Sequence, residues 1–160
     1  MADIIRSPRL EELPRLSALG FRSKAFWGYD EAFMEACRAE LSFQPGELTT
    51  TSLALMERDM ALVAVAQVKL EGPEAELAKL FVEPAAIGSG AGWLMFDWAW
   101  RTARALGAHR LVIEADPHAA PFYRRMGARD TGVTRSHSIS GRLLPRLVLA
   151  LRPDTGNEPS

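Results

Sequence analysis

The sequence predicts an α/β fold in which a mixed, mostly antiparallel sheet of about seven strands is accompanied by four helices. Segments with the two-residue period of strands alternate with segments of helical period, in the order β-α-α-β-β-β-α-β-α-β-β. A strand, a glycine-rich loop, a helix and a further strand lie in the middle of this order. A right-handed crossover of that kind makes the fourth and fifth strands parallel neighbours within the sheet.

The length and composition are typical of one globular domain, which we expect over residues 1–152. The chain has 160 residues, of which 48% are hydrophobic and 24% are charged. Residues 153–160 are polar, so we expect a disordered tail there. The formal net charge of -1 gives no indication of a nucleic acid partner or of binding to a membrane surface.

Cysteine usage and the apolar segments indicate the compartment. The single cysteine, Cys37, excludes an internal disulfide and an all-cysteine metal site, and it is typical of a reducing environment. The first residues include acidic side chains and no apolar run, so we expect no signal peptide. The longest uncharged apolar stretch, residues 61–68, is far shorter than the roughly 20 residues of a membrane helix. We therefore expect a cytoplasmic protein.

The first part of the chain predicts one strand followed by two helices. Residues 2–6, ADIIR, resemble a short strand, and Pro8 opens a segment in which leucines recur at helical spacing. Asp30 can cap the N-terminus of a second helix over residues 31–41 because its side chain can accept hydrogen bonds from the first turn. The segment between these helices, KAFWGYD, is rich in aromatic residues.

Three consecutive strands are expected next, over residues 48–58, 60–72 and 74–84. These segments are rich in β-branched and apolar residues and are separated by short turns at Arg58-Asp59 and Gly72-Pro73. Turns this short join antiparallel neighbours, so the three strands should form a meander.

The rest of the chain predicts two helices among three strands. Apolar residues recur at helical spacing from residue 88 to Gly107, which can end the helix. The apolar segment 109–115 follows as a buried strand. Asp116 and Pro117 can then begin a helix that ends at Gly127. The segments 132–140 and 144–152 are expected to be the last two strands.

Residues 84–93, PAAIGSGAGW, place Gly88, Gly90 and Gly92 directly before the helix that is predicted to follow the fourth strand. Glycines at these positions can expose backbone N–H groups at the positive end of the helix dipole, where phosphate binds. The competing interpretation is that the glycines only allow close packing in a tight turn. The segment lacks the Lys-Ser/Thr of a nucleotide P-loop, and its spacing differs from the dinucleotide pattern G-x-G-x-x-G.

Residues 77–128 resemble the core of the GNAT superfamily of N-acetyltransferases. They contain a strand ending in Leu-x-Val-x-Pro, a loop of the type [Q/R]-x-x-G-x-[G/A], a helix, a strand and a short helix carrying Tyr123. The resemblance implies a splayed parallel pair of strands and binding of acetyl-CoA as cosubstrate, without a metal. One residue departs from the pattern, since Ile87 takes the position of the usual Gln or Arg and offers only its backbone.

The resemblance also implies how acetyl-CoA is held. Its pantetheine arm would pair with the edge of the fourth strand at Leu80, Phe81 and Val82, and the N–H of Phe81 or Val82 would meet the oxyanion. The Ser89 hydroxyl can partly replace the missing polar side chain of residue 87. The pyrophosphate would lie on the backbone N–H groups of the loop, which comprises Ile87, Gly88, Ser89, Gly90, Ala91, Gly92 and Trp93.

Tyr123 takes the position of the family's general acid, which protonates the departing thiolate of coenzyme A. The alternative is that Tyr123 only packs beside Phe122. Asp116 takes a position that is often Asn in the family and is a candidate for a cofactor contact, although capping the following helix explains it equally well. The general base is open between Glu114, Glu83 and water. Glu114 is the less usual of the two because it interrupts an apolar strand.

Recognition of the acceptor is expected from the region between the first two helices. Lys24, Phe26, Trp27 and Tyr29 can form an aromatic wall for a cation or ring, or Phe26 and Trp27 can close a hydrophobic cluster under the helical hairpin. The arginines 124, 125, 129, 142 and 146 are expected to be mostly solvated, with one or two near the phosphates of the cofactor. His118 and His137 are expected to have no dedicated role.

The functional hypothesis is an acetyl-CoA-dependent N-acetyltransferase that acts on a primary amine of a small molecule or a protein. The alternative is a non-catalytic acyl-CoA-binding sensor or interaction domain, which the departure at Ile87 favours and the presence of Tyr123 disfavours. The exposed final strands make a homodimer a further expectation.

Overall fold

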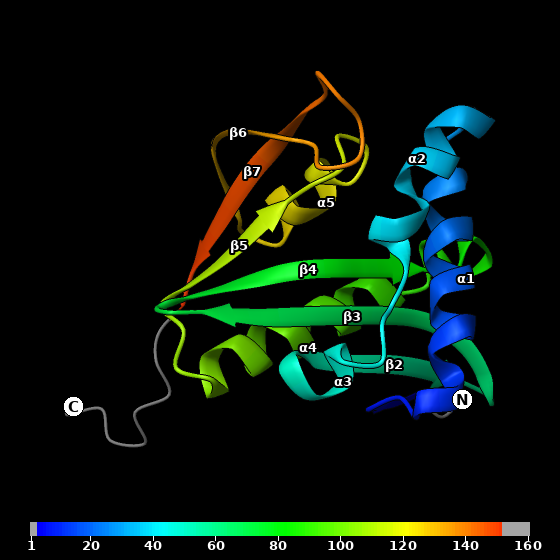
Figure 1. The fold of residues 1–160 in the computed structure, drawn as a ribbon. Helices are drawn as coiled ribbons and strands as arrows, with labels where there is room; N and C mark the ends of the chain where they lie inside the picture. The colour runs from blue at the N-terminus through cyan, green and yellow to red at the C-terminus, as the bar shows by residue number, and fades with distance from the viewer. Residues whose placement is uncertain (1–2, 152–160) are drawn as a thin grey trace.

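The fold is a seven-stranded mixed sheet with helices on both faces (Figure 1), seen in a computed structural model that describes residues 3–151. The strand order is β1-β2-β3-β4-β5-β7-β6, and all neighbours are antiparallel except β4 and β5. The strands are β1 (Asp3–Arg6), β2 (Ser52–Arg58), β3 (Ala61–Glu71), β4 (Glu74–Val82), β5 (Arg110–Glu114), β6 (Arg129–Arg135) and β7 (Leu143–Ala150). The mixed sheet and the parallel pair expected from the sequence are confirmed.

The helices lie in two layers. In Figure 1, α1 and α2 cover the front face of the sheet, and α4 lies across its back face. The α-helices are α1 (Leu13–Ala25), α2 (Glu31–Leu41), α3 (Glu47–Thr50), α4 (Ala91–Ala105) and α5 (Ala120–Arg125), with 3-10 turns η1 (Leu10–Glu12) and η2 (Pro84–Ala86). The expected disordered tail, residues 153–160, and the domain boundary at residue 152 lie outside the described residues.

Alternation along the strands divides the core between the two faces. Leu53 and Leu55 of β2 and Val65 of β3 pack against α1, whereas Ala54 and Met56 of β2 pack against α4. A larger cluster joins α4, α5, β5 and β7, and it includes Phe96, Leu111, Ile113, Tyr123 and Leu147. Burial of these side chains fixes the strand register because a slip by one residue would expose them.

Short turns join β2, β3 and β4 into the expected meander. Arg58 pairs with Ala61 and Glu71 pairs with Glu74, so each turn has two central residues. The first turn is centred on Asp59 and Met60, one residue later than predicted. Both have positive φ, 51° and 70°, as in the hairpin turns whose twist matches that of the strands.

Several predicted boundaries are wrong. The segment predicted to start a strand at residue 48 first forms the extra helix α3, because the hydroxyls of Thr49 and Thr50 donate to the Gly46 carbonyl. This local bonding overrides the β propensity of threonine. The sixth strand was predicted over residues 132–140 but ends at Arg135, where the Ser136 hydroxyl accepts from the N–H groups of Ser138 and Ile139.

The helix predicted to begin after Asp116 begins at Ala120. The Asp116 carboxylate instead accepts from the His118 N–H at 2.8 Å and stabilises the turn before α5. Gly107 follows the last turn of α4 with a φ of 84°, as predicted for a residue that ends a helix.

The parallel strands β4 and β5 separate soon after they meet, as the resemblance implied. They pair only at three positions, ending with Glu76 and Val112. Immediately beyond this point, Gln67 pairs with Lys79 and Val68 pairs with Leu77, so Ala78 is an extra residue on β4. Such a β-bulge bends a strand and disrupts its pairing. The sheet therefore opens between the ends of β4 and β5, as Figure 1 shows.

Candidate functional site

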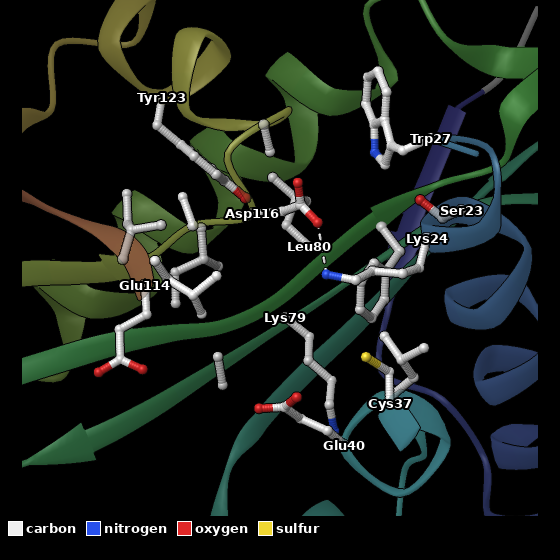
Figure 2. A pocket seen from close by; sticks show the side chains of 18 residues that line it. Ser23, Lys24, Trp27, Cys37, Glu40, Lys79, Leu80, Glu114, Asp116 and Tyr123 are labelled. Atoms are coloured by element: carbon white, nitrogen blue, oxygen red, sulfur yellow. Dashed lines mark hydrogen bonds and ion pairs between the residues drawn. The ribbon is translucent and has the colours of Figure 1, made fainter. Parts of the chain in front are cut away.

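A cavity occupies the gap between β4 and β5. Its walls include residues 77–81 of β4 and residues 113–116 at the end of β5, together with Tyr123 of α5. Side chains of α1 and α2 close it from the side, and Figure 2 shows Lys24, Cys37 and Glu40 among them. Segments far apart in the sequence therefore meet where β4 and β5 have separated within the sheet.

The glycine loop exposes backbone donors at the start of α4. Ile87, Ser89 and Leu94 donate their N–H groups to the carbonyls of Pro84, Ala86 and Gly90. Within residues 3–151, the N–H groups of the other residues from the loop into the first turn have no acceptor; these are Gly88, Gly90, Ala91, Gly92 and Trp93. Five free donors at the positive end of a helix make a site suited to an oxyanion.

Conformation explains the glycines at 88 and 90. Their φ values are 81° and 90°, and an added Cβ would meet nothing within 4 Å. A Cβ on Gly92 would lie 3.6 Å from Phe122 and Val82, an ordinary contact distance. Close packing does not explain the first two glycines, but the left-handed backbone of the turn does, and phosphate binding by the loop stays a prediction.

Ser89 holds the loop in this shape. Both its hydroxyl and its N–H donate to the carbonyl of Ala86. Ile87, at the position where the family usually has Gln or Arg, is 48% exposed, and Trp93 is 54% exposed. The side chain of Ser89 thus shapes the loop from within, while those of Ile87 and Trp93 face solvent beside the free amides.

The second half of β4 has a free edge. Leu80, Phe81 and Val82 pair with Ala66, Val65 and Ala64 of β3 on one side. On the other side, pairing with β5 has already ended at Glu76, so this edge has no strand partner within the described chain. The free edge connects the glycine loop to the cavity.

Tyr123 is 6% exposed, and its ring packs against Phe96 and Phe122. Its hydroxyl points into the cavity in Figure 2 and forms no hydrogen bond with any residue from 3 to 151. Burial raises the pKa of this hydroxyl well above its ordinary value, and the nearby negative charge of Asp116 raises it further. The group is therefore protonated at neutral pH and available as a donor.

Asp116 is the centre of a polar cluster beside Tyr123. Its carboxylate lies 2.6 Å from Lys24 Nζ, accepts from the Tyr29 hydroxyl at 2.8 Å, and lies 3.5 Å from Arg142 Nη2. Burial opposes ionisation of Asp116, but hydrogen bonds from Lys24 and the His118 N–H outweigh it and lower the pKa. Burial, followed by the bond to Asp116, raises the pKa of Tyr29 to about 12.

This cluster contains two residues that were predicted to contact the acceptor and one that was not. Lys24 and Tyr29 were predicted from the aromatic segment between α1 and α2. Arg142 was predicted to be mostly solvated, but its side chain is only 17% exposed. No local pattern identifies it, because the loop before β7 brings it to Tyr29 from 113 positions away.

The two candidate bases differ in their surroundings. Glu83 forms a two-bond ion pair with Arg22, at 2.7 and 3.0 Å, and it is not among the residues that line the cavity. Glu114 lines the cavity and has no ion-pair partner within residues 3–151. Figure 2 shows its carboxylate directed away from the Tyr123 hydroxyl.

Phe26 and Trp27 lie at the surface and are 52% and 39% exposed. They contact each other edge to face, and Trp27 stacks on His118 with a centroid distance of 5.0 Å. Trp27 also lines the cavity. The alternative in which the two residues close a cluster under the helical hairpin is wrong, since that cluster is built from Met34, Cys37 and Leu41.

Other residues that line the cavity were not predicted. They include Ser23 of α1, Cys37 and Glu40 of α2, and Lys79 of β4. Burial lowers the pKa of Lys79, whose ammonium donates to the Ser42 carbonyl at 2.8 Å. Two further findings concern residues 3–151: no cluster of three or more His, Cys, Asp or Glu could hold a metal, and no helix is long and apolar enough to cross a membrane.

Comparison with known proteins identifies what this geometry resembles. The model of the Acetyltransferase (GNAT) family matches residues 17–128. The PaiA N-acetyltransferase from Thermoplasma acidophilum, solved with coenzyme A, has a similar structure with a TM-score of 0.79. That match has 17% sequence identity and covers 94% of this chain and 99% of the other. A search of curated proteins found no match.

Two further solved structures share the fold. A GNAT family acetyltransferase from Brucella melitensis in complex with acetyl-CoA has a TM-score of 0.67 and 19% identity, with 96% of this chain and 90% of the other covered. A putative GNAT family acetyltransferase from Desulfovibrio desulfuricans has a TM-score of 0.69 and 18% identity, with 93% and 99% covered. At these identities the likeness concerns the fold.

Proposed function

Because the chain belongs to the GNAT acetyltransferase family, we propose that it transfers an acetyl group from acetyl-CoA directly to a primary amine, in a ternary complex. In this proposal Tyr123 is the general acid. The free N–H groups at the start of α4 carry the proposal, because they lie at the end of an unpaired strand edge that leads into a cavity containing Tyr123.

The residues present fit acetyl-CoA. The N–H groups of Gly88, Gly90 and the first turn of α4 would bind the pyrophosphate, and the absence of side chains at the two glycines leaves the approach open. The free edge of β4 would offer the backbone groups of Leu80 and Val82 to the amides of the pantetheine arm, whereas those of Phe81 face its partner Val65 on β3. The N–H of Val82 would stabilise the oxyanion that develops on the thioester carbonyl.

Tyr123 would supply the proton that the reaction requires. When the amine attacks the thioester carbonyl, the carbon–sulfur bond breaks and a thiolate leaves. The Tyr123 hydroxyl carries its proton at neutral pH, as an ordinary tyrosine does, and burial raises its pKa further, so the proton is in place when the thiolate leaves. The products are the N-acetylated amine and coenzyme A as the thiol.

The acceptor must lose a proton to become nucleophilic. Glu114 is the carboxylate that we propose for this role, since it lines the cavity without an ion-pair partner in the described chain, whereas Glu83 is bound to Arg22. Because Glu114 points away from Tyr123, a water molecule would carry the proton between the amine and its carboxylate.

The acceptor would enter from the side of α1 and α2, where Lys24 and Trp27 line the cavity with Asp116, to which Tyr29 donates a hydrogen bond. The exposed position of Phe26 suits contact with a larger acceptor. A homodimer and a cytoplasmic location stay predictions from the sequence.

Two measurements test the proposed function. Isothermal titration with acetyl-CoA should show saturable binding, and thiol release should follow when members of a panel of primary amines are added. Absence of binding would contradict the proposal. Binding without thiol release on any amine would instead favour the non-catalytic acyl-CoA sensor.

A further inference from the structure

Arg142 uses only part of its hydrogen-bonding capacity. Its Nη2 donates to the Tyr29 hydroxyl at 2.7 Å and lies 3.5 Å from Asp116 Oδ2. Among residues 3–151, its Nε and Nη1 groups have no acceptor. Within the same residues, Gln67 Oε1 is the only fully buried polar side-chain atom without a partner, so the free nitrogens of Arg142 reach solvent-accessible space.

Aromatic rings hold the guanidinium in place. Its central carbon lies 4.8 Å from the centroid of the Phe33 ring and 5.2 Å from that of Tyr29. Stacking of this kind restricts the plane of an arginine and reduces the entropy lost when it binds a further acceptor. Arg142 is therefore a preorganised donor with unused N–H groups.

The cluster around Asp116 has an excess of positive charge. Lys24 and Arg142 both contact the one carboxylate, and the three side chains are 15%, 17% and 12% exposed. Glu40 also lies on this side of the cavity, but it accepts from Ser138 and forms no ion pair with either cation within the described chain. A partly buried charge without a counterion is unfavourable, and a bound oxyanion would relieve it.

We propose that Arg142 binds a carboxylate of the acceptor, so that the substrate is a small amine that also carries a carboxylate group. This inference rests on the proposed acetyl transfer. Asp116 connects Arg142 to the cavity wall, and Lys24 places a second cation beside the same position. Arg142 is not itself among the residues that line the cavity, so the acceptor carboxylate would bind at its edge and the amine would extend past Asp116 toward Tyr123.

Matched acceptors test this assignment. Thiol release from acetyl-CoA is measured with L-α-amino acids and β-alanine, and with the carboxamide of each. The amine of a carboxamide is the weaker base and is more often neutral, so a preference for the acid must come from the protein. We expect kcat/KM to be about tenfold or more higher for the preferred acid than for its amide, because the amide leaves the arginine unpaired.

Variants assign the preference to Arg142. Arg142→Gln should reduce the ratio of kcat/KM for the acid to kcat/KM for its amide to about one. Arg142→Lys should reduce this ratio less, because the charge stays but the planar donors are lost. Arg135→Gln, which removes an exposed arginine of β6, controls for the loss of one charge and should keep the ratio. A ratio that Arg142→Gln leaves unchanged, or a preference for amides in the wild type, would overturn the assignment.

Binding of product analogues gives a readout that needs no turnover. N-acetyl-L-amino acids are titrated against the wild type and Arg142→Gln, with their N-acetyl amides for comparison. We expect at least one acid to bind the wild type and to lose about tenfold in affinity in the variant. If no acid binds and none is acetylated preferentially, the assignment is wrong even where acetyl-CoA binds and other amines react. Failure of acetyl-CoA to bind would contradict the proposed function without affecting this measurement.

Discussion

The Lys24 ammonium lies 2.6 Å from the Asp116 carboxylate, although 92 positions separate the two residues in the chain. The pair joins the end of α1 to the loop between β5 and α5. Through Tyr29 and Arg142 it also holds the start of α2 and the loop before β7. One carboxylate thus fixes three segments that surround the mouth of the cavity.

Removal of either partner should destabilise the protein. Lys24→Met leaves Asp116 without its closest cation, and Asp116→Leu leaves Lys24 and Arg142 without a counterion, so each should cost about 1–3 kcal/mol in the free energy of unfolding. Urea denaturation of both single variants and the double variant measures the coupling. The double variant should lose less than the sum of the two, whereas additive losses would show that the pair is not coupled.

Gly90 should be intolerant of a side chain because of its backbone conformation. Gly90→Ala places a Cβ at a φ of 90°, and relief of that strain would move the free N–H groups at the start of α4. We expect the affinity for acetyl-CoA, measured by titration, to fall about tenfold or more.

Gly46→Ala is the matched control for this change. Gly46 also has open space where a Cβ would lie, but its φ is -62°, which any residue adopts. The control should keep its affinity for acetyl-CoA and its stability, or gain about 0.4–1 kcal/mol. Equal losses of affinity in both variants would contradict the role assigned to the left-handed backbone.

Acid should destabilise the protein in part through Glu12. Hydrogen bonds from Arg6, with the N–H of Arg9, lower the pKa of this carboxyl from 4.5 to about 2. A carboxyl with a depressed folded pKa stabilises the fold above its unfolded pKa, and that contribution is lost as pH falls through the folded value. The free energy of unfolding should therefore decline between about pH 4.5 and 2, and less steeply in Glu12→Gln. If the free energy of unfolding falls equally steeply with pH in the wild type and in Glu12→Gln, Glu12 contributes nothing to the acid sensitivity.

Local patterns in the sequence were sufficient to predict the central part of the fold. Gly88 and Gly90 were identified because a phosphate can approach the backbone only where side chains are absent, and Tyr123 was identified through the resemblance to the GNAT superfamily, which has a tyrosine on the helix after the fifth strand. The meander was predictable because short turns separate apolar segments, and its turn at Gly72-Pro73 has the expected position.

The remaining features depend on contacts that no local pattern reveals. Helix α3 forms where threonine hydroxyls bond to Gly46 in place of strand pairing. Arg142 resembled a surface residue because its partners Tyr29 and Asp116 lie 113 and 26 positions away. The sequence favoured Glu114 over Glu83 because Glu114 interrupts an apolar strand, but the ion pair of Glu83 with Arg22 is visible only in the structure. A polar cluster whose members come together only through tertiary contacts cannot be predicted from local sequence patterns.

The rate of thiol release by Tyr123→Phe, at saturating acetyl-CoA and with an amine that the wild type acetylates, tests the proposed mechanism most directly. The substitution removes only the hydroxyl and keeps the ring that packs against Phe96 and Phe122. We expect kcat to fall about 100-fold, as for loss of a general acid, while the affinity for acetyl-CoA is unchanged. A variant as fast as the wild type would contradict the assignment of Tyr123 as the proton donor.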